Sequence, residues 1–184
     1  TIQGILAARA LPVLADLDVE SYQLDPTDVE NKITENTRAI MPVHMMGQPC
    51  DMDSIMAIAQ KHNLRVIEDA CQAHLAEHRG RKLGTIGDVG CFSFQSSKNL
   101  TAGEGGFLST NDERLYDRAR SFTHVGRLKK AQWYEHALPG ANFRIANIQS
   151  ALLLAQMRRL DRQTAVRDRN GRYLARELAR IEGV

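Results

Sequence analysis

The chain has 184 residues, of which 43% are hydrophobic and 25% are charged, and its formal net charge is +2. This length is sufficient for one domain with a sizeable core, and the ordinary composition argues against a disordered or fibrous chain. The small net charge argues against nucleic-acid binding through neutralised phosphates. No apolar run approaches the roughly 18 residues that a membrane-spanning helix needs, so we expect no membrane partner.

Apolar runs of strand length alternate with helical patterns along the chain, and the first residues have the pattern of a helix interior. Such alternation is typical of an α/β fold with a mainly parallel sheet. We expect strands at residues 12–16, 38–43, 64–67, 89–94 and 106–109, and helices at residues 26–33, 51–62, 112–122 and from 146 onward.

Polar side chains follow two of these expected strands. Asp69 comes directly after the strand at residues 64–67, and Ser93 lies in the strand that leads into a loop carrying Lys98. In an open parallel sheet, ligands bind at the carboxyl ends of the strands. We therefore expect the Asp69 and Lys98 segments to face one another across a crevice.

The stretch SSKNLTAGEGG places Lys98 between hydroxyl-bearing residues and a glycine cluster. One interpretation is a surface lysine on a glycine-containing turn. A second is a nucleotide phosphate loop, but the chain contains no G-x-x-x-x-G-K-[ST] motif. A third is a lysine that forms a Schiff base with pyridoxal phosphate (PLP). That chemistry needs a nucleophilic amine, a carboxylate for the pyridine nitrogen and a phosphate donor, and Lys98, Asp69 and Ser93 supply one of each.

The three cysteines, Cys50, Cys71 and Cys91, are odd in number and widely spaced, and they match no disulfide framework. We therefore expect a reducing, cytoplasmic setting. Cys71 and His74 form a C-x-x-H pair, but no second pair with ligand spacing follows it. We expect no metal site.

Five stretches, taken together, resemble the DegT or StrS family of PLP-dependent sugar aminotransferases, which have the aspartate aminotransferase fold type I. The stretches are PVLADLD, ITENTRAIMPVHMMGQPCDMDSI, VIEDACQAH, GDVGCFSFQSSKNLTAGEGG and GANFRIANIQSALLLAQMRRLD. The resemblance covers nearly the whole chain and implies a three-layer α/β sandwich with a mainly parallel sheet, the large PLP-binding domain of that fold type.

The resemblance also implies residue roles. Lys98 would be the internal aldimine lysine and the base that moves the substrate proton. Asp69 would pair with the pyridine nitrogen, Gln72 would lie near the ring oxygen, and Ser93 would hold the phosphate. Asn142, in G-A-N-F-R, would reach the phosphate of a neighbouring subunit, so the resemblance implies a homodimer with shared sites.

His44, in MPVHMMGQP, matches a family histidine and is a candidate pocket residue. Members of the family carry a preceding segment and a C-terminal small domain, and neither is recognised here. We therefore expect residues 1–145 to be the central part of the PLP-binding large domain. Residues 146–184 would be a long helical segment leading toward the small domain.

The function that the resemblance implies is transfer of an amino group from glutamate or glutamine to a keto sugar, with a nucleotide-linked keto sugar favoured. A cyclitol or an aminobenzoate precursor is an alternative acceptor. One branch of the family replaces the lysine with histidine and catalyses dehydration, so the presence of Lys98 favours amino transfer. A second hypothesis is a non-catalytic regulatory or oligomerisation module that kept the fold. An NAD-type domain would need G-x-G-x-x-G after its first strand, and none is found there.

Overall fold

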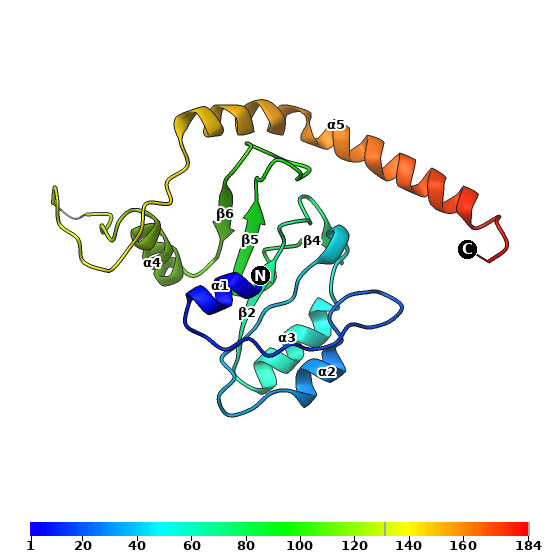
Figure 1. The fold of residues 1–184 in the computed structure, drawn as a ribbon, viewed down its shortest axis with the longest axis horizontal. Helices are drawn as coiled ribbons and strands as arrows, with labels where there is room; N and C mark the ends of the chain where they lie inside the picture. The colour runs from blue at the N-terminus through cyan, green and yellow to red at the C-terminus, as the bar shows by residue number, and fades with distance from the viewer. Residues whose placement is uncertain (131, 184) are drawn as a thin grey trace.

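The structure is a computed structural model that describes residues 1–130 and 132–183, and it has a mixed α/β fold (Figure 1). The helices are α1 (Ile2–Ala7), α2 (Pro26–Asn31), α3 (Met52–Lys61), α4 (Glu113–Thr123) and α5 (Asn147–Leu178), with a short 3-10 helix over Met45–Gly47. The strands are β1 (Ala39–Ile40), β2 (Arg65–Asp69), β3 (Glu77–His78), β4 (Arg81–Lys82), β5 (Val89–Ser93) and β6 (Gly106–Ser109).

The main sheet has four strands in the order β1-β2-β5-β6. β1 pairs with β2 and β2 with β5 in parallel, whereas β6 runs antiparallel to β5. The register sets Asp69 opposite Cys91 and Ser93 opposite Gly106. The predicted mainly parallel sheet is therefore confirmed, and the last residues of β2 and β5 lie at the same edge of it.

The hydrophobic core lies between α3 and the first two strands of the sheet. α3 buries Met52, Ile55, Ile58 and Ala59, which recur at helical spacing, and β2 contributes Val66. Fully burying an aliphatic side chain of this size contributes about 1.5–3 kcal/mol to stability. This packing fixes the position of β2 and so of the residues at its carboxyl end.

The strand predicted at residues 12–16 is wrong. The segment is not a strand, because its hydrogen bonds go to other groups. Asp16 N donates to the Asp28 carboxylate, Asp16 O accepts from Asp25 N, and Leu14 O accepts from Lys32 Nζ. The nearest sheet-like pairing is a single bridge between residues 17 and 24.

A two-stranded hairpin, β3–β4, was not expected from the sequence. Its turn is formed by Arg79 and Gly80, whose φ angles of 48° and 79° suit the type I′ turns that join tight hairpins. Strands of two residues are too short to show an alternating pattern, so periodicity does not detect them.

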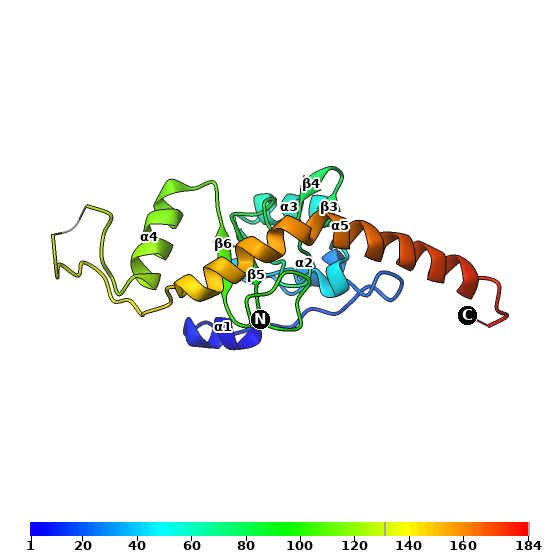
Figure 2. The same cartoon turned by 90° about the horizontal axis from the view of Figure 1, so that it is seen from above.

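The helices lie on both sides of the sheet. In Figure 2, α1 lies on one side of the β5–β6 pair and α3 on the other, while the first half of α5 passes over β5 and β6. The second half of α5 extends away from the rest of the chain (Figure 1). Within residues 1–130 and 132–183, no helix combines the length and the apolar character needed to cross a bilayer.

Asp112 begins α4, and its carboxylate accepts hydrogen bonds from Arg114 N at 2.8 Å and Leu115 N at 3.2 Å. Asp112→Ala is expected to lower the free energy of unfolding by about 1 kcal/mol, because two helix N–H groups lose their acceptor. Chemical denaturation measures the change. Asp117→Ala, an exposed aspartate in the middle of the same helix, is the control and should have the smaller effect.

Candidate active site

Asp69 ends β2, and both of its carboxylate oxygens are hydrogen-bonded. Oδ1 accepts from Cys71 N at 3.2 Å, and Oδ2 accepts from the Thr1 hydroxyl at 2.5 Å. Burial alone would raise the pKa of Asp69, but these hydrogen bonds outweigh it and hold the pKa below its ordinary value. The structure thus presents an oriented, half-buried carboxylate at the carboxyl end of the sheet.

Ser93 ends β5, the strand beside β2, two residues after the register partner of Asp69. Its hydroxyl oxygen accepts a hydrogen bond from Gln95 N at 3.3 Å. Within the part of the chain that the structure describes, the Ser93 hydroxyl donates no hydrogen bond to a protein acceptor. Its proton is therefore available to an anionic ligand.

Lys98 lies in the connection between β5 and β6. The connection is closed at its base by hydrogen bonds from Phe94 N to Gly105 O at 2.8 Å and from Ala102 N to Phe94 O at 2.9 Å. The Lys98 side chain is half-buried, and its amine makes no hydrogen bond or ion pair with any of residues 1–130 and 132–183. The amine is therefore free to meet another group.

Lys98 and the segment after Asp69 influence one another electrostatically. Burial and the Asp69 carboxylate raise the pKa of Cys71 to about 12, and the positive charge of Lys98 opposes that shift. Burial lowers the pKa of His74, and the Lys98 charge lowers it further. The positive charge of Lys98 therefore acts on the segment that follows Asp69, and the facing of Asp69 and Lys98 across a crevice stays a prediction.

His74 adds an imidazole to the same region. Its ring centroid lies 5.8 Å from that of Phe92 and 6.1 Å from that of Phe94. Both ring nitrogens are buried, and neither makes a hydrogen bond of good geometry among the described residues. The Ser93 backbone lies close enough to the ring to raise the pKa of His74 against the effect of burial.

Gln72 connects the site to the turn after β1. Its side-chain oxygen accepts a hydrogen bond from Met46 N at 2.7 Å. The Gln72 amide group donates no hydrogen bond within the described ranges. An uncharged donor is therefore available three residues after Asp69, as the family resemblance implies.

His44 does not line an open pocket, so its assignment as a candidate pocket residue is wrong. The side chain is 0% exposed, and Nε2 lies 3.1 Å from Glu68 Oε2. Nδ1 accepts a hydrogen bond from Cys50 N at 3.2 Å. Because both ring nitrogens are occupied, His44 supports the turn at residues 45–47 from inside the protein.

Glu68 was missed by the sequence analysis. Its side chain is 0% exposed, and its carboxylate accepts from Ile86 N and Gly87 N at 2.6 Å and from Gly84 N at 2.7 Å, in addition to His44. Burial would raise the pKa of Glu68, but these bonds lower it overall. The sequence did contain a sign of its role, because Glu68 lies within the apolar strand LRVIED. A carboxylate buried in such a strand is stable only if several hydrogen-bond donors surround it.

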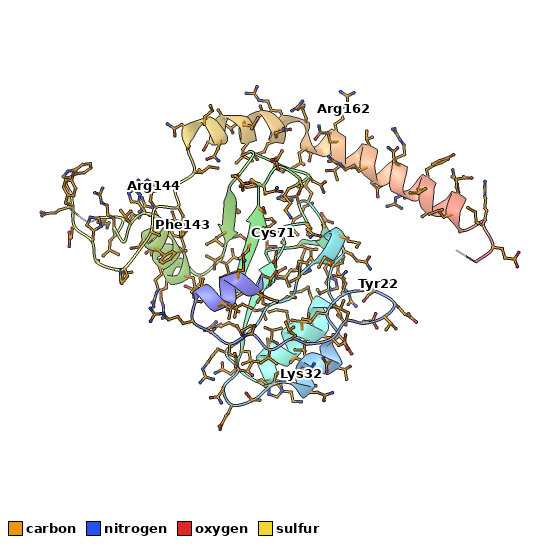
Figure 3. All side chains as sticks on the ribbon, viewed as in Figure 1. Tyr22, Lys32, Cys71, Phe143, Arg144 and Arg162 are labelled. Atoms are coloured by element: carbon orange, nitrogen blue, oxygen red, sulfur yellow. The ribbon has the colours of Figure 1, made fainter. Side chains whose placement is uncertain are left out.

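Asn142 does not join Lys98 in this subunit. It is exposed, its side-chain oxygen accepts from Arg144 N at 3.5 Å, and its backbone forms a bridge with His124. Figure 3 shows Phe143 and Arg144 beside α4, away from Cys71 in the centre of the molecule. The role of Asn142 in a neighbouring subunit stays a prediction.

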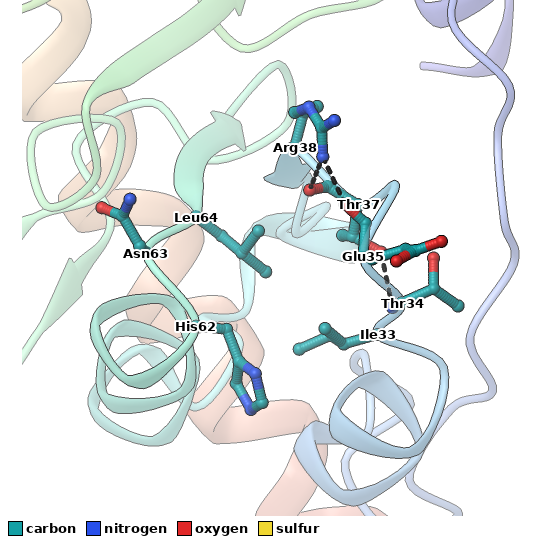
Figure 4. Close-up of a pocket in the computed structure, with 8 residues that line it drawn as sticks. All are labelled: Ile33, Thr34, Glu35, Thr37, Arg38, His62, Asn63 and Leu64. Carbon is teal, nitrogen blue, oxygen red and sulfur yellow. Dashed lines mark hydrogen bonds between the residues drawn. The ribbon is translucent and has the colours of Figure 1, made fainter.

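A separate depression of about 610 Å³ lies at the other edge of the sheet (Figure 4). It adjoins the starts of β1 and β2, whereas Asp69 ends β2. Arg38 Nη1 donates to the carbonyl oxygens of Glu35 and Thr37, so the guanidinium is already occupied by its own loop. The lining is formed by Ile33, Thr34, Glu35, Thr37, Arg38, His62, Asn63 and Leu64.

The sheet order, the strand-end carboxylate and the loop lysine can be compared with known proteins. The family model described as the DegT/DnrJ/EryC1/StrS aminotransferase family matches residues 1–184. The chain belongs to this family. The recognition made from the sequence motifs is thereby confirmed, and so is the fold class.

Similar proteins are identical to the chain at about two fifths of the aligned positions. GDP-perosamine synthase from Caulobacter vibrioides is 44% identical over 172 residues, which cover 94% of this chain and 46% of that protein. L-glutamine:2-deoxy-scyllo-inosose aminotransferase from Streptoalloteichus tenebrarius is 42% identical over 189 residues, which cover 95% of this chain and 43% of that protein. The chain therefore spans about half the length of the curated relatives that it matches.

Solved structures agree with the family assignment. The sugar aminotransferase CalS13 from Micromonospora echinospora superposes with a TM-score of 0.93 at 33% identity, covering 99% of this chain and 52% of that one. The structure of 3-amino-5-hydroxybenzoic acid synthase superposes with a TM-score of 0.91 at 37% identity, and the match covers 100% of this chain and 49% of that one. Both superpose along nearly the whole of the chain.

Proposed function

We propose that the protein is a PLP-dependent aminotransferase that moves an amino group from glutamine or glutamate to a ketone of a sugar or cyclitol. The observation that carries this proposal is the half-buried, unpaired amine of Lys98, whose charge acts on Cys71, the residue that also donates to the carboxylate ending β2. Membership of the aminotransferase family supports the reaction type. The non-catalytic alternative gives no reason for a lysine amine without a charge partner at this position.

The side chains at the sheet edge fit PLP. Lys98 would hold the cofactor covalently, the Asp69 carboxylate would pair with the pyridine nitrogen, and the Ser93 hydroxyl would donate to the phosphate. Gln72 would donate to the ring oxygen.

PLP supplies an electron sink that stabilises negative charge on the carbon bearing the amino group. The chain supplies the proton chemistry. Lys98 Nζ would accept the proton from the substrate carbon in one half of the reaction and would donate a proton to it in the other. Asp69, with a lowered pKa, would stay anionic and stabilise a proton on the pyridine nitrogen.

The acceptor is proposed from the relatives. The names of the two similar proteins above indicate a cyclitol ketone as the acceptor of one and a nucleotide-linked amino sugar as the product of the other. We propose a nucleotide-linked keto sugar or a cyclitol as the acceptor, with an aminobenzoate precursor as a further candidate because a synthase of such a compound shares the fold.

We also propose a homodimer in which Asn142 reaches the phosphate site of the neighbouring subunit. Its exposure supports this role, and so does the position of the next residue, Phe143, away from Cys71 (Figure 3). Large apolar side chains are exposed on α1 and α5, as expected of surfaces that a second chain covers. Examples are Ile2, Leu6, Ile148, Leu154 and Met157.

The expected domain division and location are proposals as well. Residues 1–145 would form the central part of the PLP-binding large domain and residues 146–184 a helical segment leading toward a small domain. The projection of α5 beyond the sheet supports this division (Figure 1). The three cysteines are free, which is consistent with a reducing, cytoplasmic setting.

The absorption spectrum of the full-length protein with added PLP tests the proposed function. A visible band should form, and glutamine or glutamate should bleach it as the amino group moves to the cofactor. Addition of a keto sugar or cyclitol should then restore the band. A protein that forms no band would contradict the aminotransferase function and favour the non-catalytic module.

A further inference from the structure

The Thr1 hydroxyl is bonded to Asp69 rather than to its own helix. Thr1 occupies the N-cap position of α1, where a threonine side chain ordinarily accepts a hydrogen bond from a helix N–H group. It makes no such bond. Its Oγ1 instead donates to Asp69 Oδ2 at 2.5 Å, across 68 positions of sequence.

This bond completes the fixation of the Asp69 carboxylate. Cys71 N holds Oδ1 at 3.2 Å, so each oxygen has one donor and the carboxylate cannot rotate without losing at least one of them. Hydrogen bonds from neutral donors to a carboxylate are short and strong. The remaining lone pairs are left for a third donor.

We propose that Thr1 is a positioning residue for Asp69 that orients its carboxylate toward the pyridine nitrogen of PLP. The inference rests on the proposed function, since it presumes that Asp69 meets that nitrogen. Thr1 does not touch the reacting atoms and acts through Asp69. Its hydroxyl, rather than its methyl group, carries the role.

A purely structural role for the bond is the competing explanation. α1 buries none of its residues, so the Thr1–Asp69 bond could serve to anchor the helix. Anchoring would change the free energy of unfolding of the protein. It would leave the affinity of the folded protein for PLP unchanged.

The test compares Thr1→Val with Thr1→Ser in the full-length protein. Valine keeps the shape and removes the hydroxyl, whereas serine keeps the hydroxyl. Thr164→Val is the matched control, because Thr164 lies on α5 and makes no side-chain hydrogen bond with the described residues. NMR of labelled carboxyl groups gives the pKa of Asp69 in the cofactor-free protein, and titration with PLP gives the dissociation constant.

Thr1→Val is expected to raise the pKa of Asp69 and to weaken PLP binding roughly tenfold, because the carboxylate loses one charge-assisted hydrogen bond. Thr1→Ser and Thr164→Val should behave as the unchanged protein. If the unchanged protein binds PLP and folded Thr1→Val has the same Asp69 pKa and PLP affinity, the positioning role of Thr1 is overturned and the proposed function stands. If the unchanged protein binds no PLP, the proposed function and the role fall together.

Discussion

Lys98→Ala is expected to abolish covalent attachment of PLP and to slow amino transfer by about 10²- to 10⁴-fold, the range typical of losing a positioned acid–base group. Lys98 is the lysine of the connection between β5 and β6. Borohydride reduction followed by peptide mass spectrometry measures the attachment. In the unchanged protein the cofactor mass should appear on the peptide that contains Lys98.

Two variants make this result specific. Lys98→Arg keeps the positive charge but cannot form the covalent bond, so it should lose attachment as the alanine variant does. Lys129→Ala removes an exposed lysine far along the chain and should leave attachment intact. Reduction that still fixes PLP to the Lys98→Ala protein would show that another amine is the attachment point.

Glu68→Gln is expected to reduce the free energy of unfolding by about 3 kcal/mol, as is typical when one partner of a buried charged network is removed. The Glu68 carboxylate accepts from three backbone N–H groups and faces His44. The amide of glutamine would direct two donors toward groups that are themselves donors. Urea denaturation at neutral pH measures the loss.

The same carboxylate predicts an acid dependence. Its pKa is below the ordinary 4.5 in the folded protein, so the stabilisation is complete above pH 4.5 and is lost as the pH falls through the lower, folded value. Glu68→Gln should therefore flatten the fall of stability with acid. Glu20→Gln, an exposed glutamate, is the control. An unchanged acid profile in folded Glu68→Gln would contradict the assignment.

The local patterns predicted most of the sheet and the helices. β2, β5 and β6 were expected within one or two residues of their observed bounds, because each is an apolar run between turn signals. α3 was expected because its buried residues recur at helical spacing. Asp69, Ser93 and Lys98 were found because strand ends collect ligands in this class of fold.

The failures have a common physical cause, which is that they depend on contacts distant in sequence. Residues 12–16 are as apolar as a strand, but a strand also needs a partner. His44 was assigned to a pocket from its match to a family motif. Its buried partner, Glu68, lies 24 positions away and outside that motif. The bond between Thr1 and Asp69 spans 68 positions, and no periodicity or motif encodes it.

The closed base of the loop between β5 and β6 restricts how Lys98 can move. Phe94 is bonded to both Gly105 and Ala102, and the Thr101 hydroxyl also donates to Phe94 O at 3.1 Å. Carrying the amine by a swing of the whole loop would break these bonds. The Lys98 amine would therefore move between the cofactor and the substrate carbon by rotations within its own side chain, which are fast on the timescale of turnover. A lengthened loop would enlarge the volume that the amine samples and dilute its effective concentration at the reacting carbon.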